Sequence, residues 1–305
     1  MQQLYSLELN AGLTLQGAKT NFNGNLENTF EAFLLMLYCL RETANYVATY
    51  EQIIANKLVK DTRQEQIPIH LLQNRFIEQL NENERFNILL KQYNIPSYIE
   101  EANLFRELFH KFKEIPAYSE YSQHPAPEFK QQKNIIGRLI EEVILPSERL
   151  DAIIEDHFVS WDDDYYIVLN MVRGLYFDFF KRNDGDLDYC IPRINWKELN
   201  TYGHDLIVQC YSHRQKHKEM IEPRLLNWDM ERVNMMDLLL VRMTLTELLH
   251  FPNIPVKVSL NEYVEVSKIY SSPRSREFIN GILDRLMKEL KNDNKIQKAG
   301  RGLVE

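Results

Sequence analysis

Three side chains that can bind a metal ion follow one another at helical spacing in this chain. Cys210, His213 and His217 are three and four residues apart, so a continuous helix would place them on one face. Zinc accepts thiolate and imidazole ligands. No fourth ligand follows at a suitable spacing, and the neighbouring Arg214 and Lys216 disfavour a bound cation. We therefore interpret this segment as a solvated basic face and predict no metal and no cofactor.

A second group of residues could bind nucleic acid. On a helix, Arg274 and Arg285 share the flank of Phe278, four residues before it and seven residues after it. Single-stranded RNA suits such a flank, because bases stack on an aromatic ring while guanidinium groups meet phosphates. The alternative is a phenylalanine at the edge of a core, covered by the apolar stems of the arginines. The pattern alone favours the packing role over the RNA-binding role.

Motifs of catalysis are absent from the sequence. There is no phosphate-binding loop, no GxSxG motif and no dinucleotide fingerprint. The acidic segment 183–188 lacks the alternating oxygen ligands and the terminal glutamate of a calcium loop. We therefore predict that the protein is not an enzyme.

Composition and charge restrict the class of protein. The 305 residues carry a formal net charge of −8, which lowers the expectation of RNA binding for the chain as a whole. Salt screens exposed charges over about 10 Å, so one local basic face is still compatible with that total. The three cysteines are widely spaced and odd in number, which indicates a reducing compartment. With no long apolar run and no signal-peptide pattern, we predict a cytoplasmic protein without a membrane span.

Helical periodicity extends through most of the chain and predicts an all-α fold. The segment 182–192 is the best candidate for a domain boundary, because it is rich in Asp, Asn and Gly. We predict an N-terminal helical region over 1–190, a C-terminal helical domain over 191–291 and a flexible tail over 292–305.

The C-terminal domain carries the clearest element signals. The run 235–249 is apolar around most of the helix circumference, which predicts burial from several sides. Ser259 followed by Glu262 predicts a capping box, and Ser272 followed by Pro273 predicts the start of the last helix. Within that helix Gly281 indicates a close packing contact, because a mid-helix glycine is otherwise costly.

The order of these joints resembles the C-terminal half of NusB family proteins. The matching motifs are Val241-Arg242-Met243, Glu247-Leu248, Ile254-Pro255, Asn261-Glu262 and Phe278-Ile279-Asn280-Gly281. Leu4 and Tyr5 are similar to the motif of the first NusB helix. The resemblance covers roughly the last third of the chain plus its first residues, and the ordered set is specific although each dipeptide alone is weak.

The resemblance implies NusB-like helical bundles and a role in transcription antitermination. The implied ligands are boxA-type RNA of ribosomal RNA transcripts and NusE, a small ribosomal protein, within the RNA polymerase antitermination complex. By the same resemblance, Arg274, Ser275 and Phe278 occupy the RNA-contacting start of the last helix. Helical spacing adds Arg285, on the same flank, to these candidates. Asp237 maps to the side that faces NusE.

Two departures from the family pattern affect these expectations. NusB proteins open with an arginine-rich segment that contributes to RNA binding, whereas this sequence opens with Met1-Gln2-Gln3. Each lost phosphate contact weakens binding, so we expect a lower RNA affinity. Residues 25–190 form a helical expansion without a family motif, and a partner surface, a brace and a cover for the RNA site all stay open. The rival hypotheses are a helical protein-interaction scaffold that has lost RNA binding and, less favoured, a metal-dependent enzyme; homo-oligomer formation also stays open.

Overall fold

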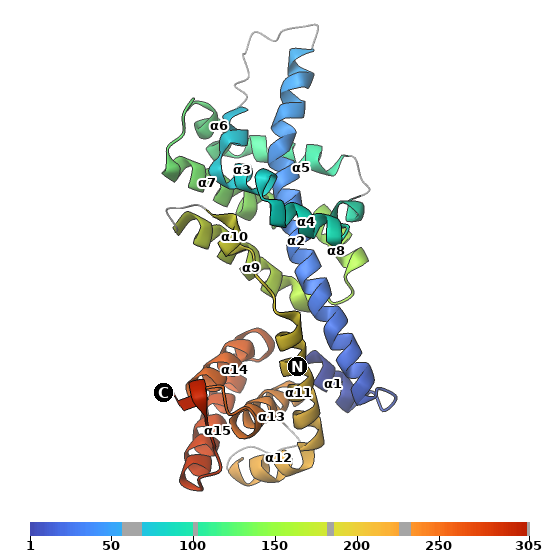
Figure 1. Ribbon diagram of the computed structural model, residues 1–305, viewed down its shortest axis with the longest axis vertical. Coiled ribbons are helices and arrows are strands. Elements are labelled where there is room, and N and C mark those ends of the chain that lie inside the picture. Colours follow the sequence, from blue (N-terminus) through green and yellow to red (C-terminus); the bar gives the residue numbers. More distant parts are fainter. Residues whose placement is uncertain (57–68, 100–102, 182–185, 226–232, 304–305) are drawn as a thin grey trace. The chain divides into compact units, whose positions relative to one another are not determined.

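The computed structural model describes residues 1–56, 69–99, 103–181, 186–225 and 233–303, and these residues form helices and connecting turns without a β-strand (Figure 1). The predicted all-α fold is confirmed. The chain divides into two compact units, which are residues 1–24 with 194–305 (the first unit) and residues 25–193 (the second unit). Within the described part, no helix has both the length and the apolar character needed to cross a membrane.

The first unit is built around one central helix. Its helices are listed in chain order: α1 (Gln2–Leu9), the first turns of α2 (Leu15–Ala55), α11 (Trp196–Ser212), α12 (Arg214–Ile221), α13 (Met235–His250), α14 (Val256–Tyr270) and α15 (Pro273–Asn292). Short 3-10 helices follow α12 (η4, Glu222–Arg224) and α15 (η6, Gly300–Leu303). Helix α13 packs against α1, α11, α12, α14 and α15, which confirms the predicted burial of this apolar run.

Beyond its first turn, two charged side chains interrupt the apolar surface of α13, and both have partners. Arg242 Nη1 lies 2.6 Å from Glu8 Oε1 of helix α1. The carboxylate of Glu247 accepts hydrogen bonds from the hydroxyl groups of Tyr202 and Tyr263. Burying a charge without such partners costs several kcal/mol, so these contacts make the central position of α13 possible.

The starts of the last two helices differ in how well the sequence predicts them. Ser272 caps α15 by accepting a hydrogen bond from the Ser275 amide, which confirms the predicted start. The capping box at Ser259 is wrong, because α14 already begins at Val256 after Pro255. Proline has a fixed φ and no backbone N–H, and the N–H groups at a helix start have no partner within the helix. Pro255 is therefore tolerated there, and the helix begins one turn earlier than the Ser259 pattern suggests.

The second unit contains the rest of α2 and the helices up to the predicted boundary. Its α-helices are α3 (Arg75–Glu82), α4 (Glu84–Gln92), α5 (Leu104–Glu114), α6 (Pro116–Ser122), α7 (Phe129–Leu139), α8 (Glu148–His157), α9 (Trp161–Lys181) and α10 (Leu187–Cys190). Shorter helices lie at Ile69–Gln73, Ile95–Tyr98 and Ile140–Ile144. Part of the predicted boundary, residues 182–185, lies outside the described residues.

Candidate functional site

The start of α15 presents one exposed cation and two engaged serines. Arg274 is exposed in the first turn of the helix. Ser275 is half-buried, its amide donates to Ser272 Oγ at 3.2 Å, and the two hydroxyl groups lie 3.0 Å apart. The positive end of a helix dipole attracts anions, so this turn combines an exposed guanidinium with a favourable helix dipole.

Phe278 lies inside the core of the first unit. Its side chain is only 5% exposed, and it belongs to the same apolar cluster as Ile279, Ile282 and Leu286. A base cannot stack on a ring that neighbouring side chains already cover. The arrangement therefore agrees with the packing role that the sequence pattern favours.

Arg285 lies on the same flank of α15 as Arg274, three turns further along. Eleven residues separate the two, which corresponds to a rise of about 16 Å along the helix axis. Arg285 is exposed, and its Nη1 donates a hydrogen bond of 3.4 Å to the backbone carbonyl of Arg224. Both guanidinium groups are thus open to solvent, while the ring between them in sequence is not.

Asp237 lies in the first turn of α13 and is 3% exposed. Its Oδ1 accepts a hydrogen bond from the hydroxyl of Ser271, the residue that ends α14. The carboxylate therefore ties the start of α13 to the joint before α15. It presents almost no surface of its own to a partner.

The cysteine and histidines do not form the solvated face that their spacing predicts. Helix α11 ends at Ser212, and His213 is the joint between α11 and α12, so the three residues do not share one continuous helix. Cys210 and His217 are both fully buried. The ring of His213 stacks on His250 at 4.6 Å, and among the described residues no group of three or more His, Cys, Asp or Glu side chains is arranged to hold a metal ion.

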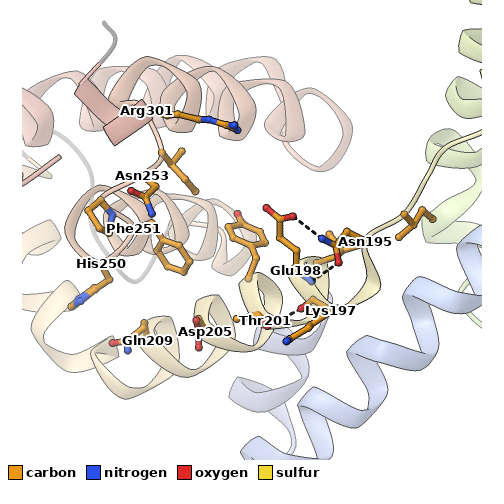
Figure 2. A pocket seen from close by; sticks show the side chains of 15 residues that line it. Asn195, Lys197, Glu198, Thr201, Asp205, Gln209, His250, Phe251, Asn253 and Arg301 are labelled. Atoms are coloured by element: carbon orange, nitrogen blue, oxygen red, sulfur yellow. Dashed lines mark hydrogen bonds between the residues drawn. The ribbon is translucent and has the colours of Figure 1, made fainter. Parts of the chain in front are cut away.

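The first unit contains a groove that the sequence did not predict (Figure 2). It has a volume of about 990 Å³ and lies between α11, the turn from α13 to α14 and the C-terminal helix η6. These three segments are far apart in the sequence, and one of them falls in the predicted tail. No local pattern could therefore have indicated the groove.

Formal charge is distributed unequally between the two units. The first unit contains 18 Lys and Arg against 16 Asp and Glu, a net charge of +2. The second unit contains 18 against 28, a net charge of −10. The acidic balance of the whole chain therefore belongs to residues 25–193, and the unit that contains α15 is slightly basic.

Comparison with known proteins gives one consistent family. A family model described as "NusB family" matches residues 181–288. The transcription antitermination protein NusB of Salinibacter ruber is 33% identical over 130 residues, which are 41% of this chain and 81% of that protein. No solved structure matches the chain.

Two further relatives carry the same name. The transcription antitermination protein NusB of Listeria innocua is 37% identical over 107 residues, which are 35% of this chain and 84% of that protein. The NusB of Chloroherpeton thalassium is 42% identical over 79 residues, which are 26% of this chain and 37% of that protein. The first two matches span most of each relative but less than half of this chain, so much of this chain lies outside each match.

Proposed function

This chain belongs to the NusB family, and we propose that it is a transcription antitermination factor that binds boxA-type RNA together with NusE. The observation that carries the proposal is the similarity to relatives named as antitermination proteins over four fifths of their length. In this proposal the RNA belongs to ribosomal RNA transcripts, and the protein acts within the RNA polymerase antitermination complex.

The distribution of charge supports RNA binding by the first unit. Nucleic-acid affinity depends on local cations that replace counterions at phosphates, and a chain-wide charge of −8 does not measure that. The first unit has a net charge of +2. Because its cations lie apart from most of the acidic residues in sequence, the acidic total is no obstacle to a local site.

The proposed RNA contacts are the exposed groups at the start and flank of α15. Arg274 and Arg285 would meet phosphates, and the positive end of the α15 helix dipole near Ser275 would favour an anion there. Phe278 enters the proposal as the residue whose packing fixes this turn, and stacking on a base would require its ring to leave the core. The burial of the ring favours the former role.

Asp237 enters the proposal for NusE binding in an indirect role. Its carboxylate is buried and bonded to Ser271, so it would shape the partner-facing surface by fixing the joint between α14 and α15. Asp237→Asn keeps the size of the side chain and removes the charge. We expect Asp237→Asn to lower the free energy of unfolding, because the bond to Ser271 is weakened. We expect a smaller loss in the free energy of NusE binding.

Fluorescence anisotropy with labelled RNA tests the proposal directly. Wild-type chain, Arg274→Ala and Arg285→Ala are titrated with boxA RNA and with a scrambled RNA of equal composition, each with and without NusE. We expect a preference for boxA that NusE strengthens, and a loss of affinity in both variants. Equal binding of boxA and scrambled RNA in every combination would contradict the proposal.

One observation favours a second candidate function. Two of the four residues that the family resemblance places at the contacts, Phe278 and Asp237, are at least 95% buried. A helical scaffold that binds proteins and has lost RNA binding would need neither of them at its surface. Binding of NusE without any boxA preference in the anisotropy measurement would support this scaffold.

A further inference from the structure

The chain beyond α15 is fastened to the turn between α13 and α14. Lys298 Nζ donates to the carbonyls of Glu247 and Phe251, at 3.1 and 3.0 Å, at the C-terminal end of α13. The amide of Ala299 donates to the carbonyl of Pro252 at 2.9 Å. Burial lowers the pKa of the Lys298 ammonium group. A cation at these carbonyls is attracted by the negative end of the helix dipole, which offsets the free-energy cost of burying the charged ammonium group.

Helix η6 approaches the same turn so closely that only glycine fits. A Cβ atom on Gly302 would lie 2.1 Å from the carbonyl oxygen of Pro252. Backbone contacts at Ala299 and Gly302 therefore hold the short segment on both sides of Arg301. The segment for which the sequence predicts a flexible tail thus forms one wall of the groove.

Arg301 is the side chain that this wall places over the groove. Figure 2 shows its guanidinium group across the opening from Glu198 of helix α11. It is exposed and makes no hydrogen bond or ion pair with any residue in the described ranges. The neighbouring backbone is held at Ala299 and Gly302, and the guanidinium group is open to an external anion.

The groove has an apolar floor and a rim that carries both signs of charge. Tyr202 and Phe251 meet edge to face at 5.4 Å on the floor, and Leu199 and Ile254 also line it. The hydroxyl of Tyr202 is already bonded to Glu247, so the rings offer mainly apolar surface. An apolar centre within a polar rim is the anatomy of a protein-binding surface.

We propose that this groove binds an amphipathic segment of a protein partner, which buries apolar side chains against Tyr202 and Phe251 and pairs a carboxylate with Arg301. The partner's neighbouring basic residues would face Glu198 and Asp205 on the α11 wall. The volume of about 990 Å³ accommodates several side chains of such a segment. This surface is separate from the proposed RNA contacts on α15, so the inference does not depend on RNA binding.

Charge complementarity favours a polypeptide over a nucleic acid in this groove. Lys197 and Arg301 are opposed by Glu198 and Asp205 among the lining residues, so the rim is balanced. A continuous row of phosphates would run against both carboxylates. A polypeptide can alternate acidic, apolar and basic residues to match the two walls.

Selection from a phage-displayed library of random peptides, with the full chain as target, tests the inference. Peptides enriched on the wild type are then measured by isothermal titration calorimetry against three variants. Arg301→Glu reverses the charge, Gly302→Ala displaces the wall, and Lys295→Glu reverses a charge of the same tail outside the groove lining. Circular dichroism checks that all variants are folded.

We expect enriched peptides with an acidic residue next to apolar ones. Their affinity should fall roughly tenfold or more in Arg301→Glu, fall in Gly302→Ala and stay unchanged in Lys295→Glu. Changing the acidic residue of the peptide to lysine should restore binding to Arg301→Glu. Absence of enriched peptides, equal affinity for wild type and Arg301→Glu, or binding of a scrambled RNA that Arg301→Glu abolishes would each overturn the inference.

Discussion

His217 is fully buried in the first unit, and neither of its ring nitrogens has a hydrogen-bond partner among the described residues. Burial lowers its pKa to about 3, and the charges of Arg242, His213, His250 and Lys216 act in the same direction. The side chain is therefore neutral in the folded protein. In the unfolded chain it takes up a proton near pH 6.5, its ordinary value.

This difference predicts a loss of stability in acid. Because the folded pKa lies below the unfolded one, the unfolded chain binds the proton first, and stability falls as pH drops from about 6.5 toward 3. At pH 5 the cost from His217 is about 2 kcal/mol. Urea unfolding at pH 7 and pH 5 should show a smaller acid loss in His217→Leu than in the wild type. The exposed His124→Leu is the control, and an identical acid loss in His217→Leu would contradict the prediction.

Phe278 gives a second prediction for a single side chain. Phe278→Ala removes a ring that is 5% exposed, and we expect it to cost about 3 kcal/mol or more of unfolding free energy. Arg274→Ala, on the exposed side of the same turn, should change stability by no more than about 0.5 kcal/mol. Thermal unfolding measures both variants. A Phe278→Ala protein of normal stability that fails to bind boxA RNA would instead make the ring an RNA contact.

At the scale of elements, the sequence predicted the parts that depend on local or periodic signals. The apolar circumference of 235–249 and the Ser272–Pro273 start both correspond to observed structure, because burial and capping leave direct patterns. The joint at His213 and the groove wall at Arg301 were missed. Both depend on contacts between segments distant in sequence, which periodicity does not report.

Two glycines show the same distinction between local and tertiary causes. The prediction of a close contact at Gly281 is wrong, since a Cβ atom there meets nothing within 4 Å. At Gly203 of α11, by contrast, a Cβ atom would lie 2.1 Å from the ring of Phe22. Gly203 is therefore the position where the first turns of α2 cross α11 closely.

The two glycines should respond to alanine with opposite signs. Gly281→Ala adds helix propensity on an exposed surface, and we expect about 1 kcal/mol of added stability. Gly203→Ala forces the Phe22 ring out of place and should cost about 1 to 3 kcal/mol. Each variant controls for the other, because both make the same chemical change in a helix of the first unit. Equal effects in urea unfolding would show that the contact at Gly203 is not restrictive.

At the scale of the whole molecule, the chain separates its charge by unit. The second unit has a net charge of −10 and the first has a net charge of +2. The net charge of the whole chain therefore does not describe the charge of the unit that contains α15. A chain-wide pI near 5.6 would by itself class the protein with non-binders of RNA. The family assignment and the composition of the first unit support the opposite expectation.

Salt dependence distinguishes these two views of the molecule, because the slope of log affinity against log salt counts phosphate contacts and not net charge. Each contact with single-stranded RNA contributes a slope of about −0.7. If Arg274 and Arg285 contact phosphates, then Arg274→Gln and Arg285→Gln should each make the slope of boxA binding less negative by about 0.7. Asp162→Asn with Asp163→Asn, at exposed acids in the first turn of α9 in the second unit, should leave the slope unchanged. A slope that changes in the aspartate variant and stays the same in both arginine variants would place the RNA elsewhere, since counterions are released only where a cation replaces them at a phosphate.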